Sequence, residues 1–204
     1  MNSYRILSLR AKGEHALSLS VLLDGDERLS LVVGNSVWES IGSPKSGDLI
    51  SDEDLETLKH ESERREAYRS AMRILEIGSV SKKGLVIKLL HKGFSRESAE
   101  FAVSRMLALG YIKEGEQARS LAAAMVRRNL WGPRRVLMAL AEKGYSSGDA
   151  HEAIEQALAA GEIDFSASRR ALLLRLKKSG VSEEKMRATL YRYGYGYGLD
   201  EEET

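Results

Sequence analysis

Cysteine is absent from the 204 residues, which excludes a disulfide framework and any thiolate metal site. No apolar run approaches the 18 residues of a membrane-spanning helix, and the start "MNSYRILSLRAKG" has no apolar segment followed by a cleavage site. We therefore expect a cytoplasmic protein that does not contact a membrane.

Groupings of residues that carry catalysis are also missing. The four histidines, His15, His60, His91 and His151, are scattered, with no HExxH or similar pairing. Neither a GxGxxG nor a GxxxxGK[ST] phosphate loop occurs. The sequence predicts a protein that is not an enzyme and that has no catalytic residues, no metal site and no cofactor.

Charge is unevenly distributed, although the net charge is only +1. Residues 1–63 carry 6 Lys/Arg against 12 Asp/Glu, whereas residues 64–199 carry 25 against 14. A basic body suits a polyanion or an acidic protein face. The alternative is that these cations form an ordinary solvated surface of a helical protein.

The first 50 residues have the two-residue period of β-strands. Alternating apolar residues at 17–23 and 29–33 flank the turn sequence "DGDE", and "YRILSLRAK" is a plausible third strand. The segment "SVWESIG" indicates a short helix that turns Trp38 and Ile41 inward. After the linker "GSPKSGD", Ser51 is placed to cap a charged helix that runs to about Ile77.

The rest of the chain is helical and repetitive. Three segments align on Gly93, Gly144 and Gly180, and each describes an amphipathic helix, a terminating glycine, one apolar residue and a serine that caps the next helix. The serines are Ser95, Ser146 and Ser182. A third helix precedes the first two pairs, at about 64–77 and 116–129, whereas "GEIDFSAS" replaces it in the third.

The predicted fold class is therefore mainly α, with tandem three-helix repeats in an elongated curved array and a small β-containing N-terminal module. The expected divisions are a β module at 1–50, a connecting helix at 51–77, repeats at 64–112, 113–160 and 161–195 (the last shortened), and a flexible acidic tail at 196–204. We expect the β module to fold apart from the array. The "YGYGYG" run, with Tyr193, Tyr195 and Tyr197, indicates a low-complexity tail, with base stacking as the alternative.

One loop stands out within the second repeat. In "NLWGPRRVLMALAEKGYS", Pro133 suits the first turn of a helix and Gly132 its cap. Arg134 and Arg135 then lie where the helix dipole disfavours cations, which indicates that they are held outward for a partner. Tyr111, Trp131 and Phe165 lie in connecting segments, where we expect packing between repeats rather than recognition.

These motifs resemble a known family. The order of "LLHKGFS", "LGYI", "GPRRVLMALAEKGYS" and "RRALLLRLKKSGVSEE" over residues 64–195 is similar to that of the bacterial regulatory protein RecX. The resemblance implies a non-enzymatic modulator that binds RecA–single-stranded-DNA filaments and inhibits filament growth, recombination and ATP hydrolysis, in DNA repair by homologous recombination and the SOS response. It implies the RecA filament and the single-stranded DNA backbone as partners, and we expect a monomer. The alternative is a helical nucleic-acid-binding module without RecA specificity.

Basic residues recur in all three repeats and are the candidates for contact with filament and DNA. They are Lys82, Lys83, Lys88, Arg127, Arg128, Arg134, Arg135, Lys143, Arg169, Arg170, Arg175, Lys177 and Lys178.

Overall fold

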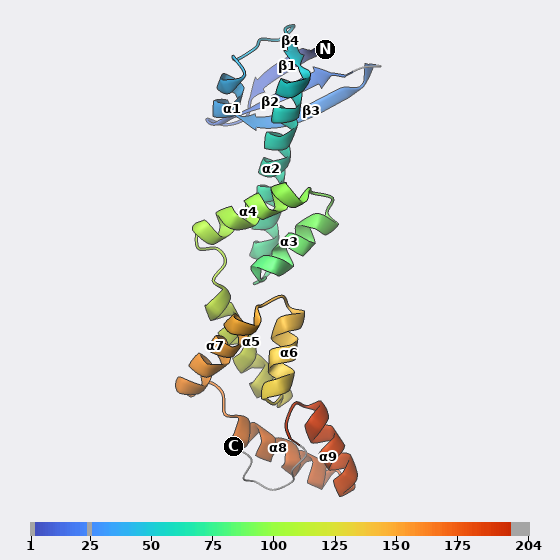
Figure 1. The fold of residues 1–204 in the computed structure, drawn as a ribbon, viewed down its shortest axis with the longest axis vertical. Coiled ribbons are helices and arrows are strands. Elements are labelled where there is room, and N and C mark those ends of the chain that lie inside the picture. The colour runs from blue at the N-terminus through green and yellow to red at the C-terminus, as the bar shows by residue number, and fades with distance from the viewer. Residues whose placement is uncertain (1–2, 24–25, 197–204) are drawn as a thin grey trace. The chain divides into compact units, whose positions relative to one another are not determined.

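The computed structural model describes residues 3–23 and 26–196. The chain divides into two compact units (Figure 1). Unit 1 comprises Met1–Ile77 and Val86–Ala108, and unit 2 comprises Gly78–Leu85 and Leu109–Thr204. The predicted fold class, mainly helical with a small antiparallel sheet near the N-terminus, is confirmed.

Unit 1 begins with an antiparallel sheet of four strands in the order β3-β2-β1-β4. The strands are β1 (Ser3–Ala11), β2 (Ala16–Leu22), β3 (Arg28–Gly34) and β4 (Leu49–Ser51). The first three correspond to the predicted strands. β4 is too short for an alternating pattern, so the sequence did not reveal it. The segment read as a linker is tied to β1, because Gly47 N–H donates to the Ile6 carbonyl at 2.8 Å and Ile6 N–H donates to the Asp48 carbonyl at 3.0 Å.

The core of the sheet is completed by helices. α1 (Asn35–Ser40) contributes the buried Trp38, as predicted, and α2 (Asp52–Ile77) contributes Leu55 and Leu58. Ser51 caps α2 as predicted, since its hydroxyl accepts the Asp54 N–H at 3.1 Å and donates to the Asp54 carboxylate at 2.7 Å. The apolar core therefore extends past residue 50. The domain boundaries themselves stay a prediction.

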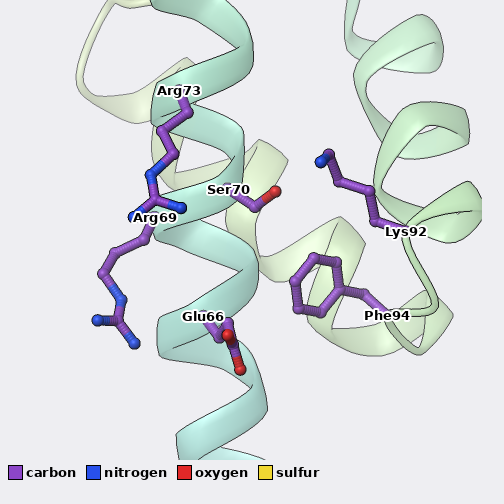
Figure 2. A pocket seen from close by; sticks show the side chains of 6 residues that line it. All are labelled: Glu66, Arg69, Ser70, Arg73, Lys92 and Phe94. Atoms are coloured by element: carbon purple, nitrogen blue, oxygen red, sulfur yellow. The ribbon is translucent and has the colours of Figure 1, made fainter.

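The second half of α2 packs against α4 (Arg96–Ala108) through small residues, with Ala67 and Ala71 on one side and Ala99 and Ala102 on the other. α3 (Lys82–His91) precedes α4, and Figure 2 shows Phe94 of the intervening turn pointing toward α2.

A carboxylate fixes the contact between α2 and α4. Glu63 accepts the Ser95 N–H at 2.7 Å and the hydroxyls of Ser95 and Ser98 at 2.8 and 2.7 Å. Although partial burial opposes it, these hydrogen bonds lower the pKa of Glu63. The start of α4 is thereby held to α2 by a charged acceptor.

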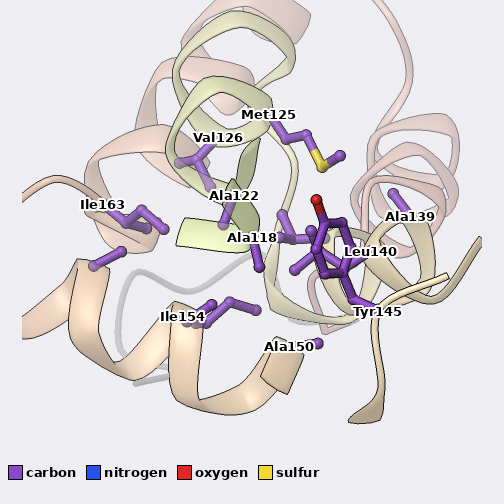
Figure 3. Packing of buried hydrophobic residues seen from close by; sticks show 13 residues of the cluster. Ala118, Ala122, Met125, Val126, Ala139, Leu140, Tyr145, Ala150, Ile154 and Ile163 are labelled. Atoms are coloured by element: carbon purple, nitrogen blue, oxygen red, sulfur yellow. The ribbon is translucent and has the colours of Figure 1, made fainter. Parts of the chain in front are cut away.

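Unit 2 is built on α5 (Glu114–Asn129), α6 (Pro133–Glu142) and α7 (Ser147–Ala159). Figure 3 shows their shared core, in which Ala118 and Ala122 of α5 lie between Leu140 of α6 and Ile154 of α7. α5 and α7 pack closely, because the alanines present little side-chain bulk. The start of α3 belongs to this unit, since the Ser81 hydroxyl donates to the Lys143 carbonyl at 2.7 Å.

The repeat signals are confirmed with one exception. Gly93, Gly144 and Gly180 end their helices with φ values of 90°, 90° and 68°, in the left-handed region that favours glycine. Ser95 and Ser146 accept N–H groups of the following helices at 3.2 and 3.1 Å. Ser182 occupies the N-cap position of α9, as predicted, but its side chain makes no capping hydrogen bond with the described residues. α9 (Glu183–Arg192) begins instead with Glu183 and Glu184, which suit its dipole.

The third repeat consists of α8 (Phe165–Lys178) and α9, and the chain that follows is part of its core. Tyr195 is only 6% exposed, and its hydroxyl donates to the Leu130 carbonyl at 3.1 Å. Burial raises the pKa of this phenol to about 12. Reading Tyr193 and Tyr195 as a low-complexity tail was therefore wrong; Tyr197 and the acidic residues after it lie outside the described residues.

Candidate functional site

The Gly-Pro loop at the start of α6 docks against the end of α9. Gly132 N–H donates to the Tyr193 carbonyl at 2.7 Å. A Cβ on Gly132 would lie 2.8 Å from the Gly194 carbonyl, and a Cβ on Gly194 would lie 2.4 Å from the Arg135 nitrogen. Both glycines are needed because two backbones meet here. Pro133 occupies the first turn of α6, as predicted.

This docking sets the positions of the two arginines that follow. The Arg134 guanidinium lies 4.5 Å from the centre of the Tyr191 ring, and that of Arg135 lies 5.0 Å from the centre of Trp131. Arg135 is half-buried and lies 3.9 Å from a Glu142 oxygen. The predicted outward position holds for the exposed Arg134, whereas Arg135 is half-buried, and both guanidinium groups rest on aromatic rings.

Arg169 departs furthest from its predicted place. It is 6% exposed, because it lies on the same face of α8 as the buried Leu172 and Leu173, three and four residues later. Its charge acts on the Tyr195 phenol, lowering a pKa that burial raises. Arg169 is thus a core residue and does not belong to an exposed binding face.

The other predicted cations are exposed, but they are not equally free. Lys82 forms an ion pair with Glu114 at 3.2 Å. Within the described part of the chain, the following form no ion pair: Lys83, Lys88, Arg127, Arg128, Lys143, Arg170, Arg175, Lys177 and Lys178. Lys88 lies in unit 1 and the rest lie in unit 2.

The most coherent of these groups is on α8. Arg170, Lys177 and Lys178 share one helix face with Leu174, because the spacing is four, seven and eight residues. Leu174 is 60% exposed, so an apolar side chain stands among unpaired cations. Such a mixture is typical of a surface that contacts an anionic partner and excludes water.

Sequence reasoning missed the arginines of α2. Arg69 and Arg73 of α2, together with Lys92 and Phe94, line a hollow of about 320 Å³, which Figure 2 shows. The signal was present in "RREAYRSAMR", where Arg65, Arg69 and Arg73 recur every four residues and so share a helix face.

Within residues 3–23 and 26–196, no helix combines the length and apolar character needed to cross a membrane. The same residues contain no cluster of His, Asp or Glu side chains that could hold a metal ion.

Comparison with known proteins tests the resemblance. No family model matches the chain. Regulatory protein RecX from each of two strains of Thermus thermophilus is 28% identical over 134 residues, which cover 66% of this chain and 85% of each relative. The predicted resemblance to the RecX family is confirmed. A crystal structure of regulatory protein RecX matches with a TM-score of 0.70 at 17% identity and covers 95% of both chains. RecX from Lactobacillus salivarius matches with a TM-score of 0.57 at 18% identity, over 66% of this chain and 90% of that one.

The structural likeness to RecX extends beyond the repeats. The first of the two structures covers 95% of this chain, so most of the N-terminal sheet lies within the shared fold. At 17% and 18% identity these structures show the fold alone.

Proposed function

We propose that the chain is a RecX-type regulator, which binds RecA–single-stranded-DNA filaments and restrains filament growth, recombination and ATP hydrolysis. The observation that carries the proposal is the match to proteins named regulatory protein RecX, over 85% of their length. The unpaired cations on α5 and α8 support a partner that is anionic.

The α8 face is the surface through which we propose this contact. Arg170, Lys177 and Lys178 are free to pair with carboxylates of the filament protein or with DNA phosphates, because no neighbouring acid in the described residues neutralises them. Arginine grips either group with two parallel hydrogen bonds. Leu174 adds apolar area at the centre of the same face.

The test is ATP hydrolysis by RecA on single-stranded DNA at increasing amounts of this protein. A filament regulator inhibits at amounts well below one molecule per RecA, because one bound molecule affects a growing filament. A plain nucleic-acid-binding module, the second candidate, inhibits only when it is abundant enough to cover the DNA. Inhibition that needs such coverage would favour the second candidate.

A charge-reversal pair locates the surface. R170E/K177E should raise the concentration needed for half inhibition about tenfold or more, as loss of close charge pairs at an interface does. The control K185E/R192E changes the charge equally at exposed, unpaired cations of α9. Equal loss in both variants would show a general effect of charge, and no loss in either would remove α8 from the interface.

A further inference from the structure

A row of arginines runs along one face of α2. Arg65, Arg69 and Arg73 are spaced by four residues, so they span about 12 Å along the helix axis. All three belong to unit 1.

Two hollows lie along this row and share Arg69. The first, here called the aromatic hollow, has a volume of about 460 Å³, within the size range of small-ligand sites. Its lining includes the cations Lys12, Arg65, Arg69 and Arg105 and the rings of Tyr68 and Phe101. The second is the hollow of Figure 2, which adds Arg73 and Lys92 beside the ring of Phe94.

The charge in the aromatic hollow is largely unneutralised. Lys12, Arg69 and Arg105 are exposed and form no ion pair in the described part of the chain. Arg65 alone has an acidic neighbour, Glu61, at 3.7 Å. Cations gathered around one concave surface with a single acid repel one another, and an anion relieves that repulsion.

The rings are placed for flat contact. Phe101 is 40% exposed although it is large and apolar, and Arg64 lies 5.2 Å from its centre. Arg64 is itself held by an ion pair with Glu97, so a guanidinium group lies over the ring in the absence of a ligand. An accessible ring beside unpaired guanidinium groups suits a ligand that has both phosphates and planar bases.

We propose that this face of unit 1 binds a short segment of single-stranded nucleic acid. Its phosphates lie along Arg65, Arg69 and Arg73, and a base stacks in the aromatic hollow on Phe101. The carboxylates of an acidic peptide would pair with the cations, but they would not stack on the aromatic rings. The inference rests on the proposed function in that it names where the chain itself holds nucleic acid, on unit 1, whereas α8 belongs to unit 2.

The test measures binding of a fluorescein-labelled 12-nucleotide oligothymidylate to the full chain by anisotropy. R69E/R105E should weaken binding about tenfold or more, and the slope of log K against log salt should fall by about 1.4, or 0.7 for each lost phosphate contact. F101L should weaken binding about fivefold or more, because a stacking partner is lost. The same variant should leave unchanged the binding of an abasic strand of equal length.

R5E/K45E is the control, since it makes the same change of charge at exposed cations of unit 1 that line neither hollow. Thermal melting checks the fold, and R69Q/R105Q replaces R69E/R105E if the latter does not fold.

Equal binding of the oligonucleotide by R69E/R105E and R5E/K45E overturns the site. Unchanged oligothymidylate binding by F101L overturns the stacking. Displacement of the oligonucleotide by dodecaglutamate at equal concentration shows an acidic-peptide site instead.

The RecA assay is read separately. Loss of oligonucleotide binding in R69E/R105E without any inhibition of RecA by the wild type would leave this site standing and remove the proposed function. Inhibition of RecA by the wild type, together with unaltered oligonucleotide binding by R69E/R105E, would remove this site and leave the proposed function standing.

Discussion

Replacing Gly194 by alanine should separate α9 from α6. Gly194 has a φ of 93°, and an added Cβ would lie 2.4 Å from the Arg135 nitrogen and 2.7 Å from the Arg135 Cβ. The left-handed backbone costs about 1–2 kcal/mol for a residue with a side chain. Relieving the clash also breaks the Gly132–Tyr193 hydrogen bond, at about 1 kcal/mol, and the contact of Arg134 with Tyr191, at about 0.5–1 kcal/mol. The expected loss in free energy of unfolding is roughly 3 kcal/mol.

Gly180→Ala is the matched control. Gly180 also has a positive φ, at 68°, but nothing lies within 4 Å of the position of its Cβ. Its replacement should therefore have only the backbone penalty of about 1–2 kcal/mol. The two variants differ in the steric clash alone.

Guanidinium unfolding followed by circular dichroism measures the loss in free energy of unfolding for each variant. A proton–nitrogen correlation spectrum shows whether the surroundings of the α6–α9 contact change. The chain has two tryptophans, and only Trp131 lies beside Arg135. In G194A the indole signal of Trp131 should move while that of Trp38 stays. If G194A and G180A destabilise equally, or if the Trp131 signal stays in place, the close approach of the two backbones is refuted.

Two further outcomes follow from buried or hydrogen-bonded charges. Arg169→Ala should lower the free energy of unfolding, measured in denaturant melts, by about 1–3 kcal/mol, because Arg169 is buried. The exposed neighbour gives the control, since Arg170→Ala should stay within about 0.5 kcal/mol of wild type. Equal effects of the two substitutions would contradict the buried position of Arg169. Glu63→Gln should lower the melting temperature at pH 7. Because hydrogen bonds hold the pKa of Glu63 below its ordinary value near 4.5, the stabilisation is fully present above that value and is lost as pH falls through the lower, folded pKa. The gap between wild type and Glu63→Gln should therefore narrow toward pH 3, and a constant gap would be the contrary result.

Local patterns explain why the helices and most of their ends were predictable. A terminating glycine such as Gly144 and a capping serine such as Ser146 act within a few residues, so their signal is complete in the sequence. β4 depends on pairing with β1 some 46 residues earlier, as in Tyr4 with Ile50, and three residues carry too little pattern to reveal it.

The candidate site was harder to predict because exposure depends on packing. The burial of Arg169 could have been predicted from its spacing to Leu172, which places both on one helix face. Arg169 was predicted to be a binding residue because basic residues were counted without regard to the helix face that they occupy. The burial of Tyr195 was not readable, since its partner Leu130 lies 65 residues away. The grouping of Arg105 with Arg69 likewise requires α4 to lie against α2, which no local pattern states.

The contact between Gly132 and Tyr193 bears on how such a protein evolves. Repeat arrays gain or lose units by duplication and deletion when neighbouring units are interchangeable. Here the last helix pair is anchored to the preceding repeat by the Gly132 hydrogen bond and by Tyr195 on Leu130. A further copy inserted after residue 160 would displace these contacts, and a deletion of the pair would uncover Leu130. Insertion or loss of a unit at this point therefore costs these contacts, whereas substitution of exposed side chains, such as the cations of α8, leaves them in place.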